Sequence, residues 1–158
     1  MMAEETEDKL LAAAKKSVFN YLKYRPRSEK EIVDKLSSKG FPNEIIQDCV
    51  RYFKKTGSIN DALFAKGWAR SRLNKPLGAR LVKMELIQKG ISDDLIRDAI
   101  HEATEDYQEH EAILQLARRR LTQYRHLDQT KGRRRLYEFL VRRGFNIGEI
   151  LKVINEIT

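Results

Sequence analysis

A glycine that recurs at nearly constant spacing divides this chain into three similar stretches. Gly40, Gly90 and Gly144 fall into register when three segments are superimposed: SEKEIVDKLSSKGFPNEIIQDCV, GARLVKMELIQKGISDDLIRDAI and GRRRLYEFLVRRGFNIGEILKVI. On both sides of each glycine the apolar residues are spaced by three and four, which is the spacing of one helical face. The repeat therefore predicts a helix, a stop and a second helix, three times in succession.

Each glycine stands at the predicted end of a helix. A cation precedes it and an apolar residue follows it, as in Lys39-Gly40-Phe41, a combination typical of a helix that ends on a left-handed residue. In such an ending the residue after the glycine packs on the residue four before it. The predicted pairs are Phe41 with Leu36, Ile91 with Leu86, and Phe145 with Leu140. Helix starts are predicted at Ser28, which can form a capping box with Glu31, at Ser92 and at Asn146.

A further helical pattern precedes each pair of helices, over residues 10–24, 61–73 and 107–124. The chain is therefore predicted to be all-α, with three tandem three-helix repeats that resemble helix-turn-helix units. We expect these modules to span residues 1–57, 58–105 and 106–158. A unit of about 50 residues buries little apolar surface alone, so the modules should stack into an elongated, curved molecule.

Composition limits the compartment and the class of partner. The chain has 158 residues, 31 Lys and Arg against 23 Asp and Glu, and a net charge of +8, which favours an anionic partner. It contains no apolar run of the roughly 20 residues that a membrane span needs, and its acidic start lacks a signal core. We therefore expect a cytoplasmic protein. The single cysteine, Cys49, excludes an internal disulfide and lies on an apolar helical face, so it is predicted to be a core residue.

Motifs of catalysis and of cofactor binding are missing. There is no HExxH, CxxC, phosphate-binding glycine loop or G-x-S-x-G motif in the sequence. His101, His110 and His126 share no metal-ligand spacing and are predicted to be surface residues. The sequence therefore predicts a protein that is not an enzyme and that holds no metal or cofactor.

Two groups of basic residues are the candidate binding sites. In the middle module they are Lys66, Arg70, Arg72, Lys75, Arg80 and Lys83; in the third they are Arg118, Arg119, Arg133, Arg134, Arg142 and Arg143. The guanidinium group of arginine forms paired hydrogen bonds with phosphate or carboxylate, so the partner could be a nucleic acid or an acidic groove of a protein. The alternative is a solvated surface with cations near helix ends. Phe64 and Trp68 are predicted to pack the middle module, and base stacking by Trp68 is the alternative.

The middle module contains residues 60–72 (NDALFAKGWARSR), then Gly78-Ala79-Arg80-Leu81 and then residues 85–91 (ELIQKGI). In this order and spacing the three segments resemble the central repeat of RecX, a bacterial family of regulators of the RecA recombinase. Residues 136–145 (LYEFLVRRGF) look like the third repeat of that family, and residues 27–32 with Lys39-Gly40-Phe41 look like its first. Two departures stand at the start of the middle repeat, where Asn60 replaces an acid and Ala62-Leu63 replace a polar pair.

The resemblance implies three tandem three-helix repeats and a role without catalysis. A member of this family is expected to bind RecA and RecA filaments on single-stranded DNA. It would limit filament extension, ATP turnover, strand exchange and repressor co-cleavage, and so modulate recombination, DNA repair and the SOS response. Weak binding of single- or double-stranded DNA and a monomeric state are also expected.

Three alternatives remain open at the level of the sequence. The chain could be a sequence-nonspecific nucleic-acid-binding module that uses the arginine-rich third repeat on phosphates. A helix-turn-helix repressor fits three helices per unit, although three tandem units lack the usual dimer symmetry. A scaffold protein is the third alternative.

Overall fold

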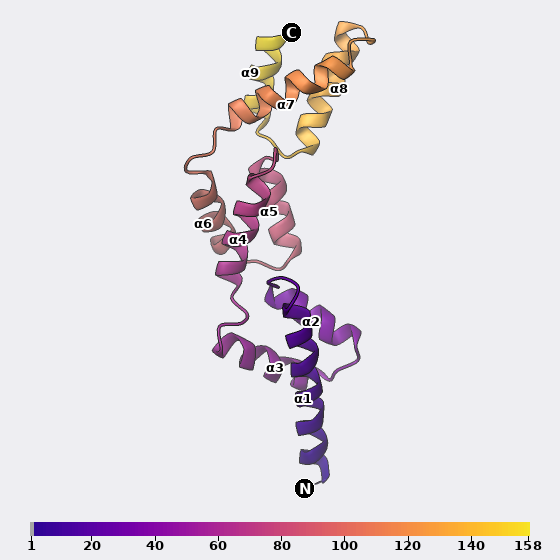
Figure 1. Cartoon of the computed structure of the whole chain (residues 1–158), viewed down its shortest axis with the longest axis vertical. Coiled ribbons are helices and arrows are strands. Elements are labelled where there is room, and N and C mark those ends of the chain that lie inside the picture. The colour runs from indigo at the N-terminus through magenta and orange to yellow at the C-terminus, as the bar shows by residue number, and fades with distance from the viewer. Residues whose placement is uncertain (1) are drawn as a thin grey trace.

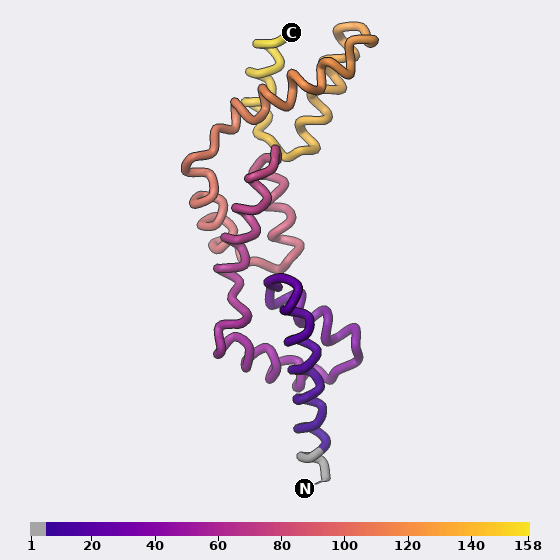
Figure 2. The backbone as a smooth tube through the Cα atoms, viewed as in Figure 1, coloured from indigo at the N-terminus to yellow at the C-terminus, as the bar shows by residue number. Residues whose placement is uncertain are grey.

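The computed structural model describes the backbone of residues 2–158 and the side chains of residues 6–158. Over that range the chain forms nine α-helices and no strand, as predicted. The helices are α1 (Met2–Leu22), α2 (Glu29–Ser38), α3 (Asn43–Lys55), α4 (Asp61–Leu73), α5 (Ala79–Gln88), α6 (Asp93–Thr104), α7 (Glu109–Gln123), α8 (Gln129–Arg142) and α9 (Ile147–Ile157). They are arranged as an elongated row of three-helix groups, with the chain ends at opposite ends of the row (Figures 1 and 2).

Each group of three helices encloses its own apolar core. Helices α1–α3, α4–α6 and α7–α9 pack among themselves, and a separate cluster of buried side chains lies within each group. Ile59 belongs to the first core although it follows α3, and Tyr107 packs against the second core although it precedes α7. Each connecting segment therefore packs against the module that precedes it in the chain. The module limits 1–57, 58–105 and 106–158 stay a proposal.

The glycine endings have the predicted geometry. Gly40, Gly90 and Gly144 adopt φ values of 80°, 76° and 82°. In the first two endings the following amide donates back across the turn, from Phe41 to the carbonyl of Leu36 at 3.2 Å and from Ile91 to that of Leu86 at 3.1 Å. All three pairs predicted from the sequence lie within the module cores. Each turn thus reverses the chain while keeping its apolar residue inside.

Side chains cap two of the three predicted helix starts. Ser28 and Glu31 form the reciprocal capping box, and Asn146 accepts bonds from two amides of the first turn of α9. Ser92 occupies the predicted N-cap position of α6, but its side chain makes no capping hydrogen bond. At the start of α4 the departure Asn60 caps the helix itself, accepting from the amide of Leu63 at 3.0 Å.

Helix α1 is longer than its apolar pattern indicated. It begins at Met2 rather than at residue 10, and residues 6–9 are exposed. These turns contribute no apolar stripe, so periodicity could not reveal them.

The middle helices of the modules meet end to end. The hydroxyl of Ser28 at the start of α2 donates to the carbonyl of Lys89 at the end of α5, at 2.7 Å. In the same way, the amide of Gly78 at the start of α5 donates to the carbonyl of Arg143 at the end of α8, at 2.9 Å. The carbonyl end of one helix dipole therefore faces the amide end of the next, which is the favourable orientation.

The start of the middle helix differs in the third module. Gly132 aligns with Ser28 and Gly78 in the repeat, but it lies inside α8, which begins at Gln129 under an Asp128 cap. Helix α8 therefore begins about one helical turn earlier in the repeat than α2 and α5 do.

A polar network ties the first module to the second. The carboxylate of Glu31 accepts from Arg25 at 2.5 Å and from the ammonium of Lys89 at 3.1 Å. That ammonium also lies over the ring of Trp68, 4.2 Å from its centroid. In addition, the amide of Glu29 donates to Asp61 at 2.8 Å.

The second junction is formed mainly by backbone. Gly78 lies so close to the third module that an added Cβ would stand 2.1 Å from the carbonyl oxygen of Gly144. The amide of Arg80 donates to that same oxygen at 3.2 Å. This junction therefore depends on the absence of side chains at its two glycines.

The thiol of Cys49 should be unreactive in the folded protein. Cys49 is fully buried, as predicted, and burial raises the pKa of its thiol to about 11. The thiolate is the reactive species, so we expect a thiol reagent such as DTNB to label the native chain only as fast as the first module opens. Urea should make labelling immediate. Rapid stoichiometric labelling without urea would contradict the packing of α3.

Candidate functional site

Two basic residues of the middle module are neutralised by α6. The ammonium of Lys66 lies 2.7 Å from the carboxylate of Glu102, and Arg70 lies 3.3 Å from the same group. The hydrogen bond and the charge of Glu102 raise the pKa of Lys66. All three side chains are exposed. Lys66 and Arg70 therefore share one helical face, as their spacing predicts, but part of their charge is already matched.

Arg72 has a structural partner on α5. Its guanidinium forks onto the carboxylate of Glu85, with nitrogen–oxygen distances of 2.5 and 2.8 Å. The indole of Trp68 donates to the same carboxylate at 2.9 Å, and the Trp68 ring stacks on Phe64 with centroids 5.8 Å apart. Arg72 and Trp68 thus hold α4 against α5, and Phe64 is buried, as the packing interpretation predicted.

The other three basic residues of the middle module point to different places. Arg80 donates to the carbonyl of Val141 at 3.3 Å, across the second junction. Lys83 lines a cleft with Asp93 and Arg97 on α6. Lys75 lines a separate cleft that faces α7. The structure therefore does not gather the six residues into one patch.

In the third module, half of the candidate arginines are engaged with neighbouring groups. Arg133 donates to the side-chain oxygen of Asn155 at 2.9 Å, and Arg134 pairs with Glu138 at 3.0 Å. Arg143 donates to the carbonyl of Pro76 at 3.4 Å, and so belongs to the second junction. These three side chains serve the fold of the module and its docking.

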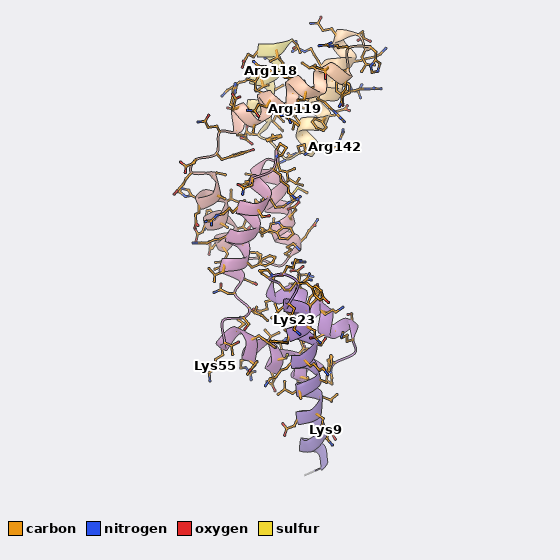
Figure 3. The ribbon with its side chains drawn as sticks, in the orientation of Figure 1. Lys9, Lys23, Lys55, Arg118, Arg119 and Arg142 are labelled. Atoms are coloured by element: carbon orange, nitrogen blue, oxygen red, sulfur yellow. The ribbon has the colours of Figure 1, made fainter. Side chains whose placement is uncertain are left out.

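The other three candidate arginines of the third module have no such engagement. Arg118 and Arg119 are exposed on α7, and Arg142 is exposed at the end of α8 (Figure 3). Across the described side chains, none of the three has a carboxylate within ion-pair distance. Lys75 and Lys83 share this property. The unpaired cations, as we call these five residues, are Lys75, Lys83, Arg118, Arg119 and Arg142.

The sequence did not predict that two of these residues line the same cleft. Lys75 and Arg119 belong to different predicted clusters and different modules, yet they line one cleft of about 300 Å³ between the α4–α5 turn and α7. Gln115 and Tyr107 line the same cleft, and neither was a candidate. No motif could have revealed the pairing because it depends on how the second and third modules dock.

The described side chains contain no group of three or more His, Cys, Asp or Glu residues that could hold a metal ion. His110, one of the predicted surface histidines, is half-buried and bridges two glutamates of α9. Its ring nitrogens lie 3.3 Å from Glu149 and 3.1 Å from Glu156, and hydrogen bonds to these two groups raise the pKa of His110. Within the same described range, no helix has the length and apolar character of a membrane span.

Comparison with known proteins matches all three modules to domains of one protein family. Family models of the first, second and third three-helix domains of RecX match residues 14–53, 60–100 and 106–154. The chain is 32% identical to "Regulatory protein RecX" of Thermobifida fusca over 148 residues, covering 93% of this chain and 80% of that protein. It is also 32% identical to the protein of the same name from Amycolatopsis mediterranei, covering 98% and 88%.

Solved structures agree with these matches. A crystal structure of regulatory protein RecX superimposes with a TM-score of 0.85 at 24% identity, covering 98% of this chain and 76% of the other. RecX from Lactobacillus salivarius superimposes with a TM-score of 0.80 at 25% identity, covering 95% and 97%. Sequence matches to all three domains and the same arrangement of helices lead to one conclusion: this chain belongs to the RecX family of regulatory proteins.

Proposed function

We propose that this chain regulates RecA by binding its filaments on single-stranded DNA. Bound there, it inhibits filament extension, ATP turnover, strand exchange and co-protease activity. The observation that carries the proposal is the match of three consecutive RecX domains to three docked modules in one elongated molecule. The proposal includes action in the cytoplasm, as a monomer and without catalysis.

The shape of the molecule supports this mode of action. A rod made of docked modules can contact several subunits of a polymer at once, and each added contact is effectively intramolecular. A rod that bridges neighbouring subunits opposes their movement and the addition of new ones. It shifts the filament toward a given conformation only by its difference in affinity for the available conformations.

Of the twelve candidate contact residues, we propose the five unpaired cations as the primary ones. The other seven have partners within the chain, and recruiting them for a ligand would first break those contacts. Lys66 and Arg70 are secondary contacts, since their pairs with Glu102 are exposed and weak.

The direct test is RecA ATP turnover on single-stranded DNA. This protein is added to preformed filaments while DNA is held in excess. We expect turnover to fall at protein concentrations well below that of RecA, because each bound rod affects several subunits. Unchanged turnover would contradict the proposal.

A second candidate function is binding of nucleic acid through phosphate contacts. It is favoured by the exposed Arg118, Arg119 and Arg142, which no described carboxylate neutralises. In the ATP turnover experiment, this function alone would lower turnover only when enough protein is present to coat the DNA. The concentration at which turnover falls therefore separates the two functions.

A further inference from the structure

We propose that the cleft between the α4–α5 turn and α7 binds a backbone phosphate of single-stranded nucleic acid, held between Lys75 and Arg119. This cleft, the junction cleft, spans the second and third modules and measures about 300 Å³. The inference gives the proposed DNA contact a definite place. Its test needs no recombinase, so its outcome is separate from that of the filament proposal.

The lining of the junction cleft is suited to an anion. Nine residues line it: Leu73, Asn74, Lys75, Pro76, Tyr107, Ala112, Gln115, Leu116 and Arg119. Two are cations and none is a carboxylate. Lys75 and Arg119 are exposed, and neither has an ion pair among the described side chains. Their charges are therefore available to a ligand without the loss of an internal contact.

The one acidic group that lines the cleft stays neutral. The hydroxyl of Tyr107 donates to the carbonyl of Leu77 at 3.0 Å, and burial raises the pKa of Tyr107 to about 12. Asp106 lines the neighbouring cleft, together with Arg70. An anion in the junction cleft thus meets no negative side chain on its walls.

The walls are held by one contact between the two modules and by one within the second module. Pro76 is held by the guanidinium of Arg143, at 3.4 Å from its carbonyl, and Leu77 is held by Tyr107. Lys75 and Arg119 are therefore brought together by the docking of the modules.

Nucleic acid fits this cleft better than an acidic protein segment does. Leu73, Pro76, Ala112 and Leu116 provide an apolar surface beside the cations, which suits the sugar and base attached to a phosphate. Arg118 and Arg142 carry unpaired positive charge beyond the cleft over the third module (Figure 3). A strand with one phosphate per nucleotide offers an anion to each cation that lies along its path, whereas carboxylates of a peptide have no such regular spacing.

Fluorescence anisotropy with a labelled 20-nucleotide oligo(dT) tests the proposal. The variant is Lys75→Gln with Arg119→Gln, and the matched control is Lys39→Gln with Lys55→Gln. The control removes the same charge from exposed positions of the first module, where Figure 3 shows Lys55. Circular dichroism and thermal unfolding establish that both variants fold.

We expect the cleft variant to lose about tenfold or more in affinity at moderate salt, and the control less than about twofold. Loss of two phosphate contacts should also reduce the slope of log affinity against log salt by about 1.4. Equal losses in both variants, or no loss in the cleft variant, would overturn the proposal.

Two further readouts identify the ligand. A duplex of the same length keeps its bases stacked inside the helix and away from the apolar wall of the cleft, so the cleft variant should weaken duplex binding less than it weakens oligo(dT) binding. An equal loss would contradict the assignment to a single strand. If the cleft variant binds oligo(dT) normally but fails to inhibit RecA turnover, the cleft takes an acidic segment of a protein, and the nucleic-acid proposal is wrong.

Discussion

Gly144→Ala should separate the third module from the second and cost about 3 kcal/mol of stability. Gly144 has a φ of +82°, which an alanine adopts only with strain. An added Cβ would also stand 2.4 Å from both the backbone nitrogen and the Cβ of Leu81. Because a backbone atom cannot rotate away as a flexible side chain can, the junction itself has to open.

The matched control for this substitution is Gly40→Ala. Gly40 has nearly the same φ, +80°, but its added Cβ would meet nothing within 4 Å. It should therefore cost only the backbone strain, about 1 kcal/mol. Urea unfolding followed by far-ultraviolet circular dichroism measures both losses. Equal losses at the two positions would show that the junction tolerates the added methyl group and that the modules dock less closely than described.

Glu31→Gln should cost about 2–3 kcal/mol at neutral pH, because it removes the central carboxylate of the first junction. Burial alone would raise the pKa of Glu31. Hydrogen bonds from Arg25, from the amide of Ser28 and from Lys89 outweigh burial and lower the pKa to about 2. The Glu31 side chain is only 16% exposed, so solvent screens these interactions weakly. The substitution leaves three cations, Arg25, Arg27 and Lys89, facing an amide.

The control for this second prediction is Asp34→Asn. Asp34 pairs with Lys30 on the surface of α2, where its side chain is 60% exposed, so its loss should change stability by less than about 0.5 kcal/mol. The contribution of Glu31 also depends on pH in a defined direction. Since its folded pKa lies below the ordinary value of 4.5, the stabilisation is fully present above that pH and is lost as pH falls toward 2.

Urea unfolding of the parent chain and of Glu31→Gln at pH 7 and pH 3 measures this effect. The difference between the two proteins should shrink by about half or more at pH 3. A difference that does not change with pH would mean that the carboxylate contributes through its shape and not through its charge.

Most of the helical architecture could be predicted from the sequence. The apolar spacing around Gly40, Gly90 and Gly144, together with the cation and apolar residue that flank each glycine, predicted where helices end and which side chains enter each core. The range 61–73 coincides with α4. These features depend on neighbours within a few residues along the chain, so they can be predicted without the tertiary structure. The extension of α1 was missed because its described side chains, residues 6–9, are exposed and bury no apolar face.

Much less of the candidate site could be predicted from the sequence. Arg72 looked like part of a basic patch, but Glu85 on the next helix neutralises it. Lys75 and Arg119 looked unrelated, but they line one cleft. Composition reports how many charges a chain has and periodicity reports which helical face carries them, but neither reports what lies across from that face.

The sequence by itself therefore determined the family, the three modules and the helices within them, since each rests on local spacing and on short motifs. The tertiary structure alone decided how the modules dock, through Ser28 on Lys89 at one junction and Gly78 on Arg143 at the other. Docking in turn decided which cations pair with groups of this chain and which remain available to a partner. The physical reason is that ion pairing and cleft formation depend on distances between residues remote in sequence, which packing sets and local pattern does not.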